Sequence, residues 1–200
     1  MNYSIRPYHV SDLTAIYKIC VKTADSGNDV SHLLTDPDLH PHYYAGPYVV
    51  LEPDLCFVIT ADGVPIGYIL GTCDSRLFRD KCEKEWFPLL RSRYAVPKIE
   101  DQSLEANLTR LIHKGKEYSE ILTTYPAHLH IDLMPQARGK GFGKELMTHF
   151  CNKLKDLNVT GLHLGVSKDN LGAVQFYEKV GFARLDENDE SITFGVLLEN

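Results

Sequence analysis

The segment ARGKGFGKEL, residues 137–146, combines three glycines with three basic residues. An interior glycine costs a helix about 1 kcal/mol relative to alanine, so glycines at this density indicate a place where the backbone comes close to something. The segment follows an apolar stretch and precedes an amphipathic helical pattern. A strand, a glycine-rich turn and a helix together direct free backbone N–H groups at an anion, and the helix dipole adds positive potential there. The segment therefore predicts a turn that binds phosphate.

Two common phosphate-binding motifs do not fit this segment. A Walker loop requires Gly-x-x-x-x-Gly-Lys followed by Ser or Thr, whereas Gly143 and Lys144 are followed by Glu145, and position 138 is not glycine. A dinucleotide fingerprint requires Gly-x-Gly-x-x-Gly, whereas the glycines here occupy alternate positions. The segment thus represents another class of phosphate-binding turn.

Polar and apolar residues alternate in AHLHIDLMP, residues 127–135, directly before the glycine turn. Because successive side chains of a strand point to opposite faces, His128, His130 and Asp132 share one face, where a covered sheet normally carries apolar residues. Histidine titrates near neutral pH, and an aspartate can orient it or accept a proton through water. We therefore predict His130 and Asp132 as candidates for a general base, ahead of His128, while a strand end whose polar groups meet solvent is the alternative. A metal site is a further alternative, but no other ligand cluster accompanies these residues, so no metal is expected.

The N-terminal half predicts the elements on one side of the sheet. Residues 3–22 indicate a strand and then a helix, with Ser11 as its N-cap. Within residues 54–74, two apolar runs are separated by Asp62 and Gly63, the signal for an antiparallel hairpin.

The remaining pattern is helical and then mixed. Residues 81–118 predict an inserted helical region over one face of the sheet, with Trp86 as a packing residue. An amphipathic helix follows the glycine turn, and a strand is expected over residues 161–167. A helix over residues 170–180 should end at Gly181, before two final strands.

Composition limits the class of protein. The 200 residues, 44% of them hydrophobic, suit a single domain spanning 1–200. A net charge of −6 argues against nucleic-acid binding through broad counterion release. Five widely spaced cysteines without a Cys-x-x-Cys pair favour a reducing, cytoplasmic environment. No apolar run reaches the roughly 18 residues of a membrane span, so a membrane is not expected as a partner. Because of the net charge, a nucleic acid is not expected either.

The glycine turn resembles the acetyl-CoA signature of the GNAT family of N-acetyltransferases, [Gln/Arg]-x-x-Gly-x-[Gly/Ala]. Arg138, Gly141 and Gly143 match it, and Gln136 with Gly139 and Gly141 matches it in a second register. Four other features agree in order: IRPYHVSDL, the Asp-Gly hairpin, HIDLMP and DNLGAVQFYEKVGF. In addition, EWFPLLRSRY and YPAHLHIDLMP resemble bacterial acetyltransferases related to the acetyltransferase-like domain of O-GlcNAcases. The resemblance covers nearly the whole chain.

This resemblance implies an α/β fold of one GNAT-like domain, with a central mixed sheet flanked by helices on both faces. It also implies acetyl-CoA as the cosubstrate, with its pantetheine arm along the strand backbone and its pyrophosphate on the glycine turn. The residues implied to bind it are Leu133, Met134, Arg138, Gly139, Lys140, Gly141, Gly143, Lys144 and Asn170.

The resemblance further implies a proton donor. In the family a tyrosine of the last helix faces the thioester, and Tyr177 matches it. A phenol stays protonated at pH 7 and can hydrogen-bond the departing sulfur, although the apolar neighbours of Tyr177 also fit a core tyrosine. The segment DLHPHYY, residues 38–44, corresponds to a region that borders the acceptor pocket in the family, and an aromatic wall and a plain surface loop both fit it.

The predicted function is transfer of an acetyl group from acetyl-CoA directly to an amine. Direct attack is favoured because neither motif contains a cysteine that would form an acyl-enzyme. The alternative is a weakly active or inactive acetyl-CoA-binding protein that serves as a sensor or interaction module. A small amine, an aminoglycoside, a peptide and a protein lysine remain open as acceptors, as do a hydroxyl acceptor and a longer acyl group. Family members occur as monomers or homodimers, and both are open here.

Overall fold

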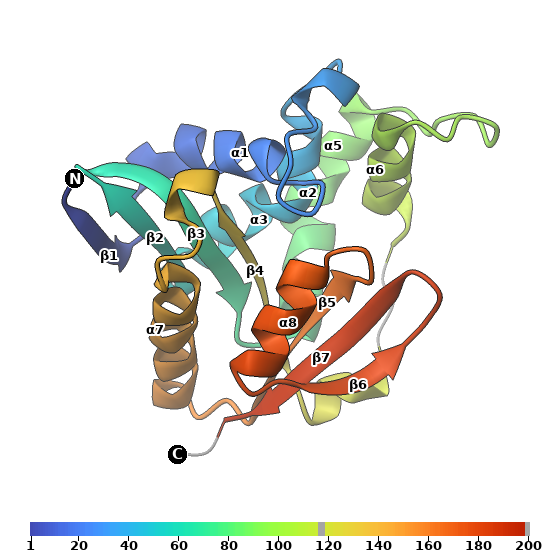
Figure 1. Ribbon diagram of the computed structural model, residues 1–200. Helices are drawn as coiled ribbons and strands as arrows, with labels where there is room; N and C mark the ends of the chain where they lie inside the picture. The colour runs from blue at the N-terminus through green and yellow to red at the C-terminus, as the bar shows by residue number, and fades with distance from the viewer. Residues whose placement is uncertain (116–118, 199–200) are drawn as a thin grey trace.

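In the computed structural model, which describes residues 1–115 and 119–198, a seven-stranded sheet runs in the order β1-β2-β3-β4-β5-β7-β6 (Figure 1). Neighbouring strands are antiparallel except for the parallel pair β4 and β5. This mixed sheet confirms the predicted α/β class. The strands are β1 Tyr3–Pro7, β2 Cys56–Ala61, β3 Val64–Thr72, β4 Ala127–Leu133, β5 Gly161–Ser167, β6 Ala183–Glu187 and β7 Ser191–Leu197.

The predicted hairpin joins β2 to β3. Ala61 pairs with Val64, so Asp62 and Gly63 alone form the turn. Their φ angles of 49° and 85° are both positive, as a type I′ turn requires. The Asp-Gly prediction is confirmed.

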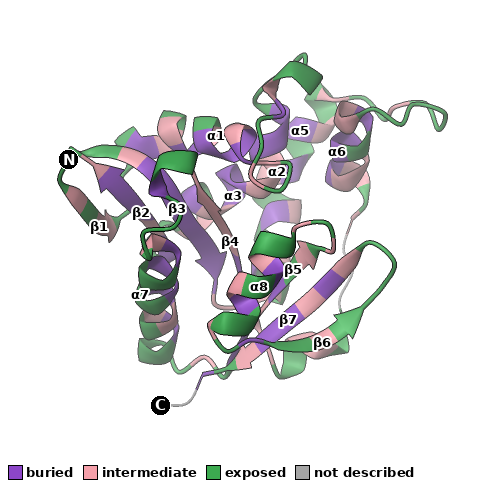
Figure 2. Cartoon of the chain, viewed as in Figure 1, coloured by how far each residue is buried: buried purple, intermediate pink, exposed green. Residues whose placement is uncertain are grey.

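Helices cover both faces of the sheet (Figure 1). On one face, α7 Phe142–Asp156 and α8 Leu171–Lys179 pack against the strands through one apolar cluster, in which Phe150 is fully buried. On the other face, α1 Leu13–Lys22 and α3 Gly46–Leu51 pack against β2 and β3. The outer sides of α7 and α8 face solvent (Figure 2). Among the described residues, no helix has the length and apolar character needed to cross a membrane.

The start of α1 differs from the prediction. A 3₁₀ turn, Val10–Asp12, precedes the helix, so Ser11 lies inside the turn and does not cap α1. The Ser11 N–H instead donates to Nδ1 of His9, and the His9 N–H donates to the Asp12 carboxylate. The N-cap assignment of Ser11 was therefore wrong, because the side chains on either side of it satisfy the free backbone groups.

The helical insertion begins earlier than predicted. It consists of α4 Ser75–Lys81, one π-helical turn at Cys82–Trp86, α5 Phe87–Arg93 and α6 Leu104–His113. The predicted boundary at residue 81 therefore falls at the end of the first helix. Residues 116–118 of the predicted insertion lie outside the described residues.

The insertion packs mainly on α2 Leu39–Tyr44. Its first helix also reaches the sheet, where Ser75 and Phe78 of α4 contact the His128 ring of β4. Trp86 lies against this helical cluster, and its Nε1–H donates to the His42 carbonyl oxygen at 2.7 Å, which supports its assignment as a packing residue. Residues 38–44 are not a surface loop, since they form α2 and bury Leu39 and His40. The buried residues of the cluster are Leu39, Phe78, Cys82, Phe87, Leu90, Leu108 and Ile112.

The feature that positions the site is the separation of β4 from β5. The two strands pair only at Ala127 with Leu162 and at His128 with His163. On its other side, β4 stays paired with β3 as far as Leu133. Beyond His128, the edge of β4 that faces β5 therefore has no strand partner, and its backbone groups are available to a ligand.

Candidate active site

A cavity of about 640 Å³ lies where β4 and β5 separate. Three segments far apart in the sequence border it: the turn after α1, the end of β4 with the glycine turn, and α8. The cavity therefore joins the predicted anion-binding turn to two of the predicted catalytic residues. Of the predicted site residues, it is lined by Asp132, Leu133, Arg138, Gly139, Gly141, Gly143, Lys144, Asn170 and Tyr177, and not by His130, Met134 or Lys140.

Two glycines of the turn have a left-handed backbone conformation. Gly139 and Gly141 have φ angles of 72° and 86°, values that residues with a side chain rarely adopt. A Cβ atom on either would meet nothing within 4 Å, so the space beside them is open. Gly143 differs, because it lies inside α7 and a Cβ atom there would make an ordinary contact of 3.4 Å with the Phe176 ring.

The first turn of α7 presents free N–H groups to the cavity. Hydrogen bonding begins with the Glu145 N–H, which donates to the Gly141 carbonyl oxygen at 3.1 Å. The N–H groups of Phe142, Gly143 and Lys144 consequently have no acceptor within the helix. Together with the helix dipole, they form a site for an anion.

The three cations of the turn have three different environments. The guanidinium of Arg138 donates to two carbonyl oxygens, through Nε to Leu133 at 2.9 Å and through Nη2 to Gly27 at 2.6 Å. The ammonium of Lys140 donates to the Tyr3 hydroxyl at 2.7 Å and does not border the cavity. Lys144 lines the cavity. Of the two predicted lysines, only Lys144 is therefore placed to meet a bound phosphate.

The turn after α1 was not predicted as part of the site. Ser26 and Gly27 line the cavity, with φ angles of 49° and 92°. Arg138 holds this turn, and a Cβ atom on Gly27 would lie 2.7 Å from the guanidinium nitrogens. The Ser-Gly pair indicated a turn in the sequence, but nothing local connected it to Arg138, which is 111 residues away.

The start of α8 is fixed by Asn170. Its side-chain oxygen accepts a hydrogen bond from the Ala173 N–H at 3.0 Å and caps the helix. The helix ends before Gly181, whose φ of 94° is the expected helix stop. Both boundaries of the predicted helix are confirmed.

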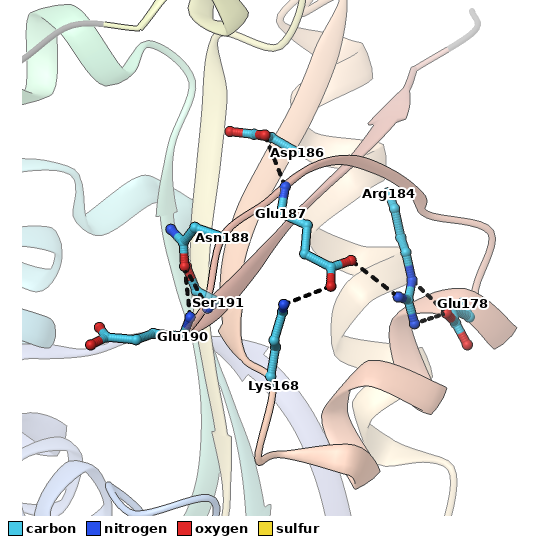
Figure 3. Close-up of polar contacts among 8 residues, drawn as sticks. All are labelled: Lys168, Glu178, Arg184, Asp186, Glu187, Asn188, Glu190 and Ser191. Atoms are coloured by element: carbon cyan, nitrogen blue, oxygen red, sulfur yellow. Dashed lines mark hydrogen bonds and ion pairs between the residues drawn. The ribbon is translucent and has the colours of Figure 1, made fainter.

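Charged residues hold α8 against the edge of the sheet (Figure 3). Arg184 of β6 donates to Glu178 of α8 at 2.8 Å and also lies 3.4 Å from Glu187. Lys168, in the loop before α8, pairs with Glu187 at 2.7 Å. These exposed pairs contribute little individually, but they link α8 to the neighbouring strand next to Tyr177.

Tyr177 lines the cavity and is largely buried. Only 7% of the residue is exposed, and its ring packs against Phe176, Phe182 and Phe194. Within the described part of the chain, its hydroxyl has no hydrogen-bond partner, and the residue borders the cavity. Burial raises the pKa of Tyr177, with a further contribution from Asp132, so the hydroxyl remains a proton donor.

Asp132 borders the same cavity from β4. Its side chain is 16% exposed, and its Oδ2 accepts a hydrogen bond from the Tyr68 hydroxyl at 2.6 Å. Burial raises the pKa of Asp132 to about 7, and the bond from Tyr68 partly opposes that effect. A carboxyl group with this pKa exchanges protons readily near neutral pH.

The two histidines of β4 have different environments. His130 lies beside Asp132, with 3.6 Å between its Nε2 and Oδ2 of the aspartate, but burial lowers its pKa to about 4. His128 is held by the Ser75 hydroxyl at Nδ1 and by the Tyr48 hydroxyl at Nε2. Since His128 has both ring nitrogens satisfied and His130 does not line the cavity, the geometry favours Asp132 as the base.

Asp132 belongs to a group of largely buried polar residues, which we call the Asp132 cluster. It contains Cys20, His40, Tyr68, His130 and Asp132. The ligand atoms of Cys20, His130 and Asp132 lie within 4.8 Å of one another, a donor set that zinc accepts. The Tyr68 hydroxyl, however, already donates to Asp132 and lies 3.3 Å from Nδ1 of His130. The three candidate ligands Cys20, His130 and Asp132 therefore surround the hydroxyl oxygen of Tyr68.

A second cavity of about 550 Å³ borders the paired end of β4 and β5. Aromatic residues from the helical side form much of its wall, among them Tyr43, Tyr44 and Tyr48. His163 of β5 also lines it, and its Nδ1 is bonded to the Tyr125 carbonyl oxygen at 2.8 Å. Of the two interpretations of residues 38–44, an aromatic wall or a surface loop, Tyr43 and Tyr44 beside this cavity favour the aromatic wall.

Comparison with known proteins agrees with this geometry. Residues 28–182 match the acetyltransferase (GNAT) family. The protein O-GlcNAcase of Rattus norvegicus is 29% identical over 182 residues, which are 90% of this chain and 20% of that protein. A mycothiol acetyltransferase of Renibacterium salmoninarum is 30% identical over 104 residues, 52% of this chain and 29% of that protein. The chain thus spans about a fifth of the O-GlcNAcase and under a third of the mycothiol acetyltransferase.

Solved structures show the same fold. The crystal structure of SsHAT is 34% identical, has a TM-score of 0.93, and both chains are covered completely. The structure of yncA, a putative acetyltransferase from Salmonella typhimurium with its cofactor acetyl-CoA, has a TM-score of 0.59 at 13% identity and covers 98% of this chain and 94% of that one. The second likeness concerns the fold alone.

Proposed function

Since this chain belongs to the acetyltransferase (GNAT) family, we propose that it transfers an acetyl group from acetyl-CoA directly to an amine. The single observation that carries the proposal is the 640 Å³ cavity, which is lined by the glycine turn and by both Tyr177 and Asp132. An anion site and a pair of proton-transfer groups are what such a reaction requires of a protein.

The residues present fit acetyl-CoA. Beside Gly139 and Gly141, the turn has open space where a side chain would otherwise project. The free N–H groups at the start of α7 suit the pyrophosphate, and Lys144 adds a positive charge. The edge of β4 that lacks a strand partner suits the amides of the pantetheine arm. At the end of this edge, the Leu133 carbonyl oxygen already accepts from Arg138 and the Met134 N–H donates to the Ile66 carbonyl oxygen. In this assignment Arg138 supports the turn through its hydrogen bonds to carbonyl oxygens.

The acceptor amine needs a base. An alkyl amine with a pKa near 10.4 is neutral in only about one molecule in a few thousand at pH 7, a deficit of roughly 4 to 5 kcal/mol. Asp132, with a pKa of about 7 and a position on the cavity wall, is the assigned base. His130 neighbours it as a neutral group.

The leaving group needs a proton. As the amine nitrogen bonds the carbonyl carbon, the carbon–sulfur bond breaks and the sulfur gains negative charge. Tyr177 is the assigned donor, because it is protonated at neutral pH and borders the cavity. The amine proton passes to Asp132, and the products are the acetylated amine and the CoA thiol.

The acceptor is assigned to the side of the second cavity. Tyr44 lines that cavity, and its ring centroid lies 5.6 Å from that of His130, so the aromatic wall leads toward the Asp132 cluster. The acceptor is an amine, and a screen of amines for release of the CoA thiol identifies it.

The first experiment is a calorimetric titration of the purified protein with acetyl-CoA, with CoA and ATP as comparators. We expect both CoA species to bind and ATP to bind weakly. An acceptor screen that detects free thiol follows. Absence of acetyl-CoA binding overturns the proposal, whereas binding without turnover over a broad panel of amines supports the alternative of a sensor or interaction module.

A further inference from the structure

Tyr68 contacts the proposed base directly. It lies on β3, opposite Asp132 in the antiparallel register with β4, and none of its surface is exposed. Its hydroxyl donates to Oδ2 of Asp132 at 2.6 Å. The His130 Nε2 approaches the same oxygen but stays at 3.6 Å, which is too long for a hydrogen bond. Tyr68 therefore donates directly to an Asp132 oxygen, and the Thr23 hydroxyl is a second hydrogen-bonding neighbour of the carboxyl group.

The rest of the Asp132 cluster is uncharged near neutral pH. Burial lowers the pKa of His40 and of His130 to about 4 each. Burial also raises the pKa of the Cys20 thiol and of the Tyr68 phenol. An ionised Asp132 in this surrounding thus depends on neutral hydrogen-bond donors for its stabilisation.

The groups around Asp132 come from every element packed against it. Arg138 contributes favourably from the glycine turn, but its guanidinium is bonded to two carbonyl oxygens. The facing groups are Cys20 of α1, Thr23 at the C-cap of α1, His40 of α2, Tyr68 of β3, His130 of β4, Arg138 of the turn and Tyr177 of α8.

From this geometry we infer that Tyr68 is a positioning residue, which orients the Asp132 carboxyl group and keeps it ionised in the pH range where it acts as base. Tyr68 does not line the cavity, so it acts through Asp132 and not on the substrate. This inference rests on the proposed function, in which Asp132 is the base. The effect of the hydrogen bond on the ionisation of Asp132 can be tested without substrate.

The test measures the ionisation of Asp132 directly. In protein labelled with ¹³C at the aspartate carboxyl carbons, the Asp132 signal is the one missing from Asp132→Asn. Its pH titration is compared between the wild type and Tyr68→Phe, both without acetyl-CoA. We expect the Tyr68→Phe midpoint to rise by about 1 to 2 pH units, the shift that corresponds to losing a hydrogen bond to a charged group.

Tyr17→Phe is the matched control. Tyr17 also has a hydroxyl bonded to a neighbour in a partly buried site, at 3.0 Å from Nδ1 of His42, but it does not contact Asp132. Its removal should leave the Asp132 midpoint unchanged. The same midpoint in Tyr68→Phe as in the wild type, or an equal shift in both variants, overturns the inference.

Two further measurements keep the test decisive. If Tyr68→Phe does not fold, the Tyr68 hydroxyl proton in the wild type, detected through its ring carbon, should shift with the same midpoint as Asp132; independent titration overturns the inference. If the enzyme proves active, the acidic limb of kcat/KM in Tyr68→Phe should move by the same amount as the carbon midpoint. Failure of acetyl-CoA binding contradicts the proposed function alone, because the titration is made on the free protein.

Discussion

Replacement of Gly141 by alanine separates the conformational role of this residue from its role in binding. Gly141 is the N-cap residue of α7, and its φ of 86° lies in the left-handed region. An alanine there costs about 1 kcal/mol for adopting that conformation, which for a chain of this size lowers Tm by about 2 to 4 °C. No steric cost adds to this, because a Cβ atom at Gly141 meets nothing within 4 Å.

The effect on binding should be much larger than the effect on stability. The added methyl group projects into the space assigned to the pyrophosphate and displaces it from the free N–H groups of α7. Loss of one hydrogen bond to a charged group corresponds to roughly a 10- to 150-fold rise in Kd. Gly141→Asp adds a carboxylate at the same place, and it should abolish acetyl-CoA binding.

Gly63 supplies a matched control. Its φ of 85° is nearly the same, a Cβ atom there also meets nothing within 4 Å, and it lies in the hairpin turn away from the cavity. Gly63→Ala should lower Tm by a similar amount while leaving the calorimetric Kd for acetyl-CoA unchanged. Equal Kd values for Gly141→Ala, Gly63→Ala and the wild type would refute the assignment of the glycine turn.

Three further predictions test the other residues of the site. Tyr177→Phe should lower kcat by about 100-fold while changing the Kd for acetyl-CoA little; equal kcat over pH 6 to 9 would leave this tyrosine as a packing residue. Because a base acts in its ionised form, wild-type kcat/KM should rise with pH through about 7, the pKa of Asp132, and Asp132→Asn should lose that limb; a limb that persists in the variant assigns it to another group. Lys144→Gln should raise the Kd for CoA about fivefold at low salt and less at high salt, whereas Lys140→Gln, whose lysine is bonded to Tyr3, should not; the reverse order would exchange the two roles.

Features set by neighbouring residues could be predicted from the sequence. Alternation along β4 places Asp132 and His130 on one face, since successive side chains of a strand point in opposite directions. The Asp62-Gly63 turn and the positive φ of Gly139 and Gly141 follow from the conformations that these residue types allow. The capping of α8 by Asn170 is local in the same way.

Properties that depend on residues far apart in the chain could not be predicted from the sequence. His130 has the residue type of a base, but its partial burial in the fold lowers its pKa to about 4, whereas burial raises the pKa of Asp132 to about 7. Arg138 occupies a motif position, yet its guanidinium is bonded to Gly27, 111 residues away.

The sequence by itself thus determined the family through its motifs, and the order of the strands and the glycine turn because local spacing fixes backbone conformation and side-chain direction. It did not reveal helices α2, α3 and α4. Only the tertiary structure decided which lysine lines the cavity and which side chain on β4 has a pKa near neutral pH. It also decided that Tyr68 is hydrogen-bonded to that side chain, Asp132. Those outcomes depend on burial and on partners from other strands and helices, and burial and partner are what set the charge of an ionisable group.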